Sequence, residues 1–296
     1  MTRILIGTEK SLHELGSDEA LLDNPNAVGH DANGWWATTD GHKVWASPDA
    51  RTWKEETSLR GLRANCIVPL DSGAIVGTSE AHLVHVAGGK SERVRSFDRL
   101  ATRDDWYTPW GGPADVRSLS RGPDGVVYAN IHVGGIATSP DGEKWQATSL
   151  DIDSDVHQVL AHPERPGAAY AATAIGLATT IDGGETWEFG DEGLHAAYCR
   201  AVAIAGDTLL LSASTSHTGR KAALYRRPID GGTFERCEKG LPEWFGDNLD
   251  THCLDARGHE AVAGTTDGKI FVSEDGGGTW TEALTGEPPV TCVAIV

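Results

Sequence analysis

The chain is short of positive charge and of methionine, and it has no long apolar segment. Its 25 Lys and Arg residues stand against 43 Asp and Glu residues, which gives a formal net charge of −18. This balance excludes a broad basic surface, so we expect no binding to nucleic acid or to an anionic membrane. No run of about 18 apolar residues occurs, and we therefore expect no membrane-spanning segment.

Motifs of several enzyme classes are also missing. The sequence has no CxxC, HxH or HExxH motif, no P-loop and no GxSxG elbow. We therefore expect neither a nucleotide-binding site nor a serine hydrolase. Five cysteines without a CxxC pair predict reduced thiols, and residues 1–9 lack the apolar core of a signal peptide, so we expect a cytoplasmic protein.

Glycine and tryptophan, by contrast, recur in a fixed pattern. Ser273–Trp280 and Thr180–Trp187 both read Ser/Thr-x-Asp-x-Gly-x-Thr-Trp, shorter variants occupy Ser47–Trp53 and Ser139–Trp145, and Pro228–Phe234 is a weaker fifth copy. In such a turn the Asp accepts hydrogen bonds from backbone N–H groups, Gly supplies a positive φ, and the closing aromatic packs between sheets. We therefore assign these Asp residues a structural role and not a catalytic one.

The five segments resemble the Asp boxes, or BNR repeats, of β-propellers, and the resemblance extends over the whole chain. It implies four-stranded antiparallel blades with each box between the third and fourth strands, on the face opposite the functional one. Asp-box propellers include sialidases, xyloglucan-cleaving glycosidases, sorting receptors and photosystem assembly factors. The resemblance therefore implies the fold more narrowly than the function.

Seven apolar runs carry a polar residue at their second position, and we expect each run to be the first strand of a blade. These residues are Asn26, Asn65, Arg117, His157, Arg200, His252 and Thr291. Most lie about 40 residues apart, the length of a propeller blade. The pattern predicts an all-β, seven-bladed propeller; six or eight blades are the alternatives, because the unit at Asn26 aligns loosely.

The two ends of the chain complete one blade in this scheme. Arg3–Gly7 and Ser11–Leu15 have strand character but no inner strand before them, whereas the last run ends at Val296 with nothing after it. We expect the C-terminal strand to pair with the N-terminal strands, which closes the ring and removes an exposed edge. No Pro-, Ser- or charge-rich linker interrupts the chain, so we expect a single domain over residues 1–296.

The resemblance also implies that first strands line the central axis of the ring. Two Arg and two His residues are then more cationic than a water-filled channel requires. We predict that Arg117 and Arg200 clamp a carboxylate, phosphate or sulfate, with Asn26 and Asn65 as further ligand-binding residues. The alternative is that these side chains hold neighbouring blades together through hydrogen bonds to loop carbonyls.

Two insertions before first strands are unusually aromatic for loops. They are Asp104–Pro113 and Glu243–Asp250, and they should lie on the same face as the entrance to the axis. We predict that their aromatic side chains stack on a ligand or cover it: Trp106, Tyr107, Trp110 and Trp244. The alternative is that these side chains pack on one another or plug the axis.

Candidate acid–base residues are His157, His252, His132 and Tyr198, and any carboxylate on this face could join them if partly buried. Such carboxylates follow second strands or precede the His157 strand: Glu9, Asp40, Glu80, Asp267, Asp151, Asp153 and Asp155. No cofactor is predicted, but imidazoles that converge would suit a transition metal. The candidate metal ligands are His132, His157, His195 and His252.

The predicted function is binding of a small anionic or sugar-like ligand, and whether the protein also acts on it as a hydrolase or lyase is left open. Sialidases have six blades, an arginine triad and a Phe/Tyr-Arg-Ile-Pro motif. The nearest string here, Tyr225–Pro228, adjoins the fifth box. We therefore expect no typical sialidase. A metal-dependent enzyme and a non-catalytic protein-interaction scaffold are the alternatives, and the oligomeric state is left open.

Overall fold

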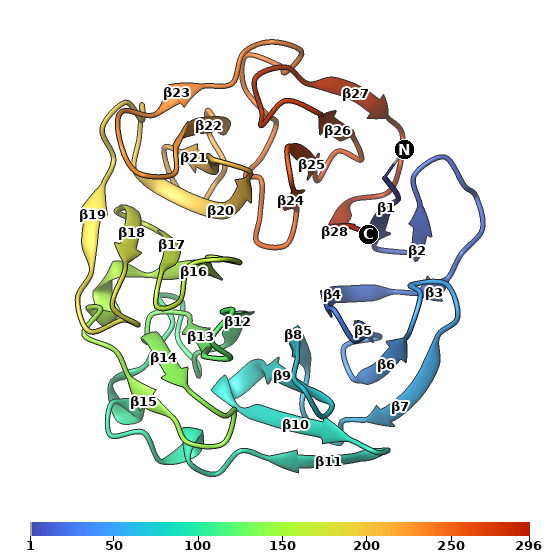
Figure 1. Ribbon diagram of the computed structural model, residues 1–296, viewed down its shortest axis with the longest axis vertical. Coiled ribbons are helices and arrows are strands. Elements are labelled where there is room, and N and C mark those ends of the chain that lie inside the picture. The colour runs from blue at the N-terminus through green and yellow to red at the C-terminus, as the bar shows by residue number, and fades with distance from the viewer. Residues whose placement is uncertain (1) are drawn as a thin grey trace. The chain divides into compact units, whose positions relative to one another are not determined.

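The computed structural model describes residues 2–296, and strands dominate it. Over these residues the strands form seven four-stranded antiparallel sheets, which are the blades of a seven-bladed β-propeller (Figure 1). The all-β fold class and the blade number predicted from the repeats are confirmed. Helical geometry in residues 2–296 is confined to short 3-10 turns, η1 (Ser79–Ala81), η2 (Phe97–Arg99), η3 (Arg103–Asp105) and η4 (Ile152–Ser154).

The blades follow one another along the chain, apart from one that combines both ends. That blade contains β28 (Val290–Ile295), β1 (Ile4–Thr8), β2 (Ser11–Glu14) and β3 (Leu22–Asp23). The next blades are β4 (Pro25–Asp31), β5 (Gly34–Thr39), β6 (Lys43–Ser47) and β7 (Lys54–Ser58), then β8 (Ala64–Pro69), β9 (Ala74–Thr78), β10 (Leu83–Ala87) and β11 (Lys90–Arg93).

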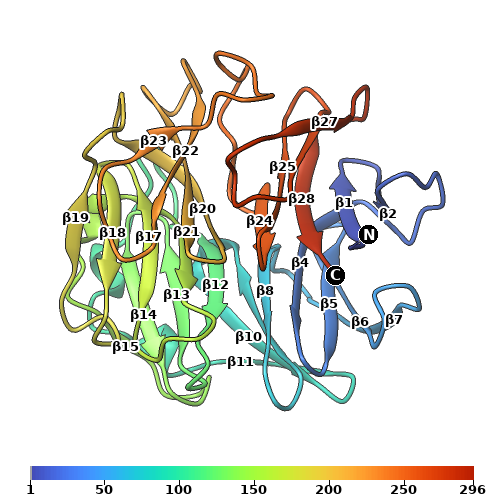
Figure 2. The ribbon, with the colours of Figure 1, turned by 45° about the horizontal axis from the view of Figure 1, so that its top comes forward.

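The remaining blades repeat the same order. They are β12 (Val116–Arg121), β13 (Val127–Ile131), β14 (Gly135–Ser139) and β15 (Gln146–Ala147), then β16 (Val156–Ala161), β17 (Ala169–Thr173), β18 (Gly176–Thr180) and β19 (Glu188–Gly190). After them come β20 (Tyr198–Ala205), β21 (Thr208–Ser214), β22 (Ala223–Pro228) and β23 (Glu235–Arg236), and finally β24 (Leu254–Arg257), β25 (Glu260–Gly264), β26 (Ile270–Ser273) and β27 (Thr281–Leu284). Figure 2 shows β12, β13 and β14 side by side within their blade.

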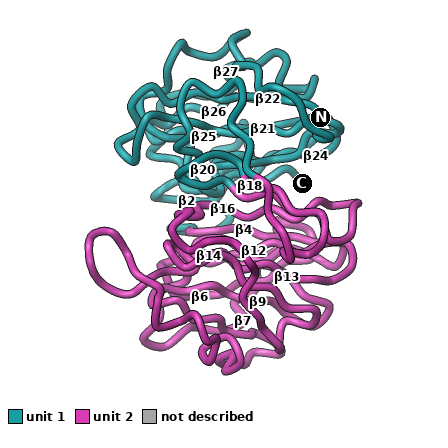
Figure 3. Tube along the Cα trace, turned by 90° about the vertical axis from the view of Figure 1, so that its left-hand side faces the viewer, with its two compact units in different colours: residues 1–25, 172–177, 189–296 teal, residues 26–171, 178–188 magenta. Residues whose placement is uncertain are grey.

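The chain divides into two compact units. Unit 1 comprises residues 1–25, 172–177 and 189–296, and unit 2 comprises residues 26–171 and 178–188 (Figure 3). Each unit has its own buried apolar clusters. Phe97 and Trp145 lie in a cluster of unit 2, whereas Leu210 and Trp280 lie in a cluster of unit 1. Both tryptophans close copies of the repeated Asp-containing turn, and their predicted burial is confirmed.

Burial falls from the second strand of a blade to its fourth. Every residue of β9, β13 and β17 is buried, whereas every residue of β11 and β15 is exposed. Strands that are apolar on both faces need cover on both sides, and neighbouring blades provide it. Short outer strands with charged residues, as in β11, also protect the free edge of a blade from pairing with another chain.

Strands from the two ends of the chain pair as predicted. β1 lies antiparallel to β28, with Ile6 opposite Val293 and Gly7 opposite Cys292. A Cβ atom added at Gly7 would lie 2.4 Å from the Sγ atom of Cys292, closer than such atoms approach. Glycine at this position therefore lets the two strands meet around a buried thiol.

The repeated Asp-containing turns have the hydrogen bonds that the sequence predicts. The carboxylate of Asp49 accepts hydrogen bonds from the N–H groups of Arg51 and Thr52, at 2.9 and 2.7 Å. Asp182 accepts bonds from both the hydroxyl and the N–H of Thr186, at 2.6 and 3.0 Å. The bond from the Thr52 N–H is the main cause that lowers the pKa of Asp49 to about 2. The bond from the Thr186 hydroxyl is the main cause that lowers the pKa of Asp182 to about 2.

The start of one predicted first strand is wrong. The sequence pattern places His252 within the strand, but β24 begins only at Leu254, and His252 lies in a turn with a φ of 68°. The Cys253 N–H donates to the Asp250 carbonyl at 3.0 Å and closes that turn. The aromatic insertion before this blade therefore continues further into the predicted strand than residue periodicity indicates.

All five cysteines are free thiols in buried positions. The prediction that Cys66, Cys253 and Cys292 are buried apolar residues is confirmed, and burial raises the pKa of Cys292 to about 12.

None of the helices in the described part of the chain, residues 2–296, is suited to crossing a membrane.

Candidate functional site

Several first strands depart from regular pairing at their polar second residue. The register of β8 against β9 shifts between Ala64 and Cys66, and that of β12 against β13 shifts between Val116 and Ser118. Asn65 and Arg117 therefore lie at β-bulges, where an extra residue disturbs the ladder and the side chain is re-aimed. Similar shifts occur beside Arg200 in β20 and beside Thr291 in β28.

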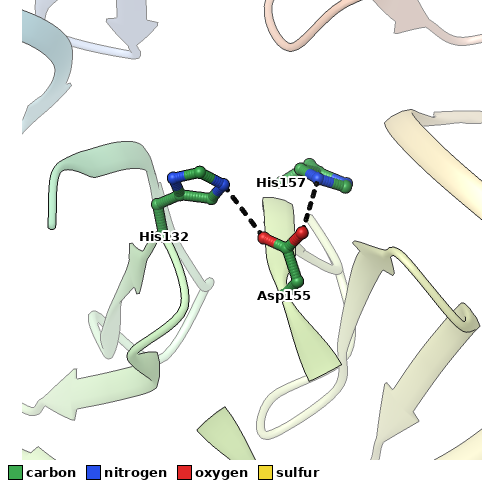
Figure 4. A group of neighbouring side chains, drawn as sticks. All are labelled: His132, Asp155 and His157. Atoms are coloured by element: carbon green, nitrogen blue, oxygen red, sulfur yellow. Dashed lines mark ion pairs between the residues drawn. The ribbon is translucent and has the colours of Figure 1, made fainter. Parts of the chain in front are cut away.

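The structure brings His132, Asp155 and His157 together in unit 2, and we call them the His–Asp–His cluster (Figure 4). The Nε2 atom of His132 lies 3.0 Å from Oδ1 of Asp155. The Nε2 atom of His157 lies 3.5 Å from Oδ2 of the same carboxylate. Two imidazoles thus share one carboxylate, each facing a different oxygen.

His132 is positioned by the tight turn that joins β13 to β14. The backbone N–H of His132 donates to the Asp115 carbonyl at 2.9 Å, and the next residue, Val133, has a φ of 42°. A β-branched residue in this left-handed region is an outlier that the surrounding structure must hold in place. A Cβ at Gly134 would lie 3.0 Å from the Trp106 ring and closer still to Ile131, so this tight packing also fixes the turn.

Asp155 and His157 come from the segment that leads into β16. The turn η4 ends at Ser154 and is followed by its C-terminal cap Asp155, which has a φ of 49°. At the start of this turn, the Asp151 side chain accepts the Asp153 N–H. Two residues later, His157 is the second residue of β16 and is fully buried. A Cβ at Gly135 would lie 3.1 Å from the Leu150 carbonyl oxygen, so glycine lets the His132 turn approach this segment.

Burial makes the charge state of this cluster costly to change. His132 is 3% exposed and His157 is fully buried, whereas the Asp155 side chain keeps 20% of its surface. Burial by itself would raise the pKa of Asp155, but the hydrogen bonds and positive charge of the two imidazoles outweigh it and hold that pKa well below its ordinary value. Asp155 is therefore ionised at neutral pH.

Part of the first aromatic insertion lies against this cluster. The ring of Trp110 stands 5.0 Å from that of His132 at a tilt of 36°, and 73% of Trp110 is exposed. The hydroxyl of Tyr107 donates to Asp153 at 3.0 Å, and its N–H donates to the Val133 carbonyl. The insertion thus binds both backbone segments that position the cluster, and it leaves two aromatic faces in solvent.

Trp106 of the same insertion has a different environment. It packs against the buried Phe97 ring, with centroids 5.6 Å apart, and the Arg103 guanidinium lies over its other side. This is the alternative that the sequence left open for the aromatic residues, namely packing in the protein interior. Trp106 therefore packs beside the turn of the cluster, and its ligand-binding role stays a prediction.

Arg200 in unit 1 is engaged by a carboxylate of its own chain. Its Nη1 atom donates to both oxygens of Asp250 at 2.9 and 3.0 Å, and Nη2 donates to the Tyr198 hydroxyl at 3.3 Å. Burial would lower the pKa of Arg200, but Asp250 outweighs that effect and raises it. The pair joins β20 to the segment before β24, so Asp250 already balances the charge of Arg200.

His195 and Trp244 meet in a second aromatic group, also in unit 1. His195 Nδ1 lies 2.7 Å from the Tyr225 hydroxyl, and its ring stands 5.0 Å from Trp244. The Arg236 guanidinium lies 3.9 Å from the centroid of the Trp244 ring, a cation–π contact. Burial, followed by the charges of Arg236 and Lys221, lowers the pKa of His195 despite an opposing hydrogen bond.

The predicted polar residues Asn26, Asn65 and Thr291 make structural hydrogen bonds. Asn26 Oδ1 accepts the Gly41 N–H at 2.7 Å, and Asn65 Nδ2 donates to the Val116 carbonyl at 3.3 Å. The Thr291 hydroxyl donates to the Pro25 carbonyl at 3.1 Å. These bonds to backbone groups are the alternative role that the sequence allowed. Arg117 is half-buried at its bulge in β12.

Sequence reasoning selected His132 and His157 but gave Asp155 no role beyond that of a nearby carboxylate. It also grouped His195, His252 and Tyr198 with them, and the structure places those three residues in unit 1 and the cluster in unit 2. The sequence feature that points to Asp155 is the Asp-x-His spacing of Asp155 and His157 at the start of a first strand. This spacing puts a carboxylate just outside a strand and an imidazole just inside it.

Comparison with known proteins identifies no family. No family model matches the chain, and no curated protein matches it. The chain is similar in structure to the WD40 β-propeller domain of Doa1, with a TM-score of 0.64 and 15% identity over 98% of this chain and 89% of that domain. It is also similar to YCF48 bound to D1 peptide, with a TM-score of 0.59 and 18% identity over 88% of this chain and 82% of that one.

A third similar structure is a catalytically inactive variant of virginiamycin B lyase from Staphylococcus aureus with quinupristin. Its TM-score is 0.59, with 13% identity over 84% of this chain and 80% of the lyase. At such identities the likeness concerns the fold alone. The neighbours include a lyase and a protein that is bound to a peptide. The chain therefore shares the propeller fold with these proteins.

Proposed function

We propose that this chain binds a small anionic or sugar-like ligand at the His–Asp–His cluster, beneath the loop that carries Tyr107 and Trp110. The observation that carries the proposal is the Asp155 carboxylate shared by two buried imidazoles, with an exposed Trp ring against one of them. Buried polar groups beside exposed aromatic surface are the usual composition of a small-ligand site.

The electrostatics of the cluster suit an anionic group. Asp155 is ionised, and each of the two imidazoles that contact it has a second ring nitrogen. An added carboxylate or phosphate can accept hydrogen bonds from imidazole N–H groups in a site with little water to compete. We propose that Arg117, also in unit 2, contributes positive charge. Trp110 supplies an apolar face on which a planar or sugar ring can stack.

The same groups support acid–base chemistry as a hydrolase or lyase. A carboxylate that holds an imidazole both orients the ring and stabilises its protonated form, which a general acid–base residue needs. Such a residue typically contributes about 10²- to 10⁴-fold in rate. We propose His157 and His132 as the acid–base pair and Asp155 as the residue that positions them.

A protein-binding function is the second candidate, and the exposure of Trp110 favours it. Exposed tryptophan is enriched at the centre of protein interfaces, where it anchors binding. The structurally similar YCF48 is bound to a peptide. A peptide with an acidic side chain could place a carboxylate on the cluster while an apolar side chain packs on Trp110.

We retain two further expectations as part of the proposal. The free, buried thiols fit the cytoplasmic location expected from the sequence. The chain also remains, in this proposal, a single domain over residues 1–296.

A thermal-shift screen of small organic acids, sugar phosphates, monosaccharides and short acidic peptides tests the proposal. Ligands should raise the Tm of the wild-type protein and of Trp244→Ala, a matched tryptophan control in unit 1. They should fail to raise the Tm of Trp110→Ala and Asp155→Asn. Hits that act equally on all four proteins would place the ligand elsewhere. Hits confined to the peptides would favour the protein-binding function.

A further inference from the structure

We infer that the His–Asp–His cluster binds one divalent transition-metal ion, with zinc as the leading candidate. This inference rests on the proposed binding of an anionic ligand, because the metal would present an open position to the anionic group, and with the metal bound His132 and His157 act as its ligands in place of the acid–base role proposed above. The ligand set consists of one oxygen of Asp155 and one nitrogen each of His132 and His157. It requires neither His195 nor His252, which the sequence had also offered as metal ligands.

The spacing of the three side chains already suits a metal ion. Their candidate ligand atoms all lie within 4.8 Å of one another, and the two Nε2 atoms lie 3.0 and 3.5 Å from the Asp155 oxygens. Ligands about 2.0–2.2 Å from a tetrahedral zinc ion are separated by roughly 3.4 Å. A zinc ion could therefore be held with small side-chain rotations and without movement of the backbone.

The backbone on both sides of the cluster is held in rare conformations. Val133, directly after His132, has a φ of 42°, and Asp155 itself has a φ of 49°. Left-handed backbone at a non-glycine residue carries a cost in stability, and such residues gather at binding and catalytic sites. Two independent segments, the β13–β14 turn and the end of η4, bear this cost and bring their side chains to the same point.

Burial points in the same direction. His157 is fully buried and His132 is 3% exposed, so few waters can solvate either imidazole. Ionised groups in such a place are stable only when they are paired or coordinate a metal. A metal ion would pair with the Asp155 carboxylate and with both ring nitrogens at once, which satisfies all three buried groups.

The types of ligand determine which metals fit. Two imidazoles with one carboxylate suit zinc, iron, cobalt or nickel, whereas magnesium and calcium prefer sites built from oxygen alone. Three protein ligands leave a fourth position for water or for the ligand, as in catalytic and not structural zinc sites.

Residues around the metal ligands also contact them or their segments. The Trp110 ring packs on His132, and the Tyr107 hydroxyl donates a hydrogen bond to Asp153. Such outer contacts orient metal ligands.

Calorimetric titration of the EDTA-treated, full-length protein with zinc chloride tests the inference. Wild-type protein should bind one zinc ion per chain and release protons on binding. Asp155→Asn and His157→Ala should each weaken binding at least 100-fold, while His195→Ala and His252→Ala should bind as the wild type does. Circular dichroism shows whether each variant is folded, and the near-isosteric Asp155→Asn decides the matter if His157→Ala does not fold.

The inference is overturned if wild-type protein binds no zinc, or if Asp155→Asn binds zinc as tightly as the wild type. The thermal-shift screen, repeated with EDTA present, separates this failure from failure of the proposed function. Ligands that still act in EDTA and still require Trp110 would support the ligand site and contradict its metal. Zinc binding without any ligand hit would support the metal and contradict the proposed ligand class.

Discussion

His132 Nε2 lies 3.0 Å from Oδ1 of Asp155, and this contact links a turn of the β12–β15 blade to the segment that begins the next blade. Asp155 turns its other oxygen toward His157, so the carboxylate is at the centre of the cluster. Both the proposed ligand site and the proposed metal site depend on this carboxylate. Removing its charge should therefore affect stability, pH response and binding together.

Asp155→Asn should lower stability at pH 6 by about 1–3 kcal/mol, the range for removing a partner from buried polar groups. The folded-state pKa of Asp155 lies below its ordinary value of 3.8, so the folded state favours the ionised form. That contribution is fully present above the ordinary value and is lost as pH falls toward the folded-state pKa. Urea unfolding at pH 6 and pH 3 should show the wild-type advantage shrinking at the lower pH; an advantage that grows would contradict this assignment.

The Asp-box turns give a prediction about structural carboxylates. Asp182→Ala removes the acceptor for both the hydroxyl and the N–H of Thr186 and should lower the Tm. Glu185→Ala changes an exposed side chain in the same turn and serves as the control, with little change expected. Neither variant should alter ligand or zinc binding, which can be measured on the same samples. Loss of binding in Asp182→Ala with the fold intact would mean that the box has a functional role.

Close packing of the two ends of the chain predicts a specific steric effect. Gly7→Ala places a methyl group against the Cys292 Sγ atom, where the Cβ would stand 2.4 Å from it. Overpacking of this kind typically costs about 1–3 kcal/mol in unfolding free energy. The double variant Gly7→Ala with Cys292→Ala should recover much of that loss, because it removes the sulfur. Gly246→Ala, which meets no neighbour within 4 Å, is the control.

The Arg200–Asp250 pair should contribute to stability and not to ligand affinity. Arg200 Nη1 donates to both carboxylate oxygens, but Asp250 keeps 43% of its side-chain surface, so we expect a coupling energy of only about 1 kcal/mol. A double-mutant cycle measures it. The exposed Arg226–Glu235 pair, at 3.9 Å, should show coupling near zero. If Arg200→Gln abolishes ligand binding while the protein stays folded, Arg200 binds the ligand, as the sequence predicts.

The fold could be predicted because its causes repeat along the chain. Turn residues such as Asp182 and Asp275 recur in the same pattern, and each makes local hydrogen bonds that need no distant partner. Sequence reasoning placed His252 in a strand because periodicity alone does not show where an insertion ends. In the structure the Asp250–Cys253 turn continues past the predicted boundary.

The candidate site was only partly predictable. His132 and His157 were visible from their positions in the repeat, but the role of Asp155 depends on a left-handed residue at the end of η4. No periodic pattern encodes that conformation. The different environments within the first aromatic insertion were equally hidden, because Trp106 packs against Phe97 whereas Trp110, four residues later in the same loop, is exposed. Only three-dimensional packing separates the residue that supports the site from the one that faces solvent.

The central claim is that the His–Asp–His cluster is a metal-binding site. The most direct test is an anomalous difference map, recorded at the zinc edge, from crystals of the wild-type protein grown with zinc. The account predicts a strong peak about 2.0–2.2 Å from an oxygen of Asp155 and from a nitrogen each of His132 and His157. A map without a peak there, or with its peak at His195 instead, would contradict the account.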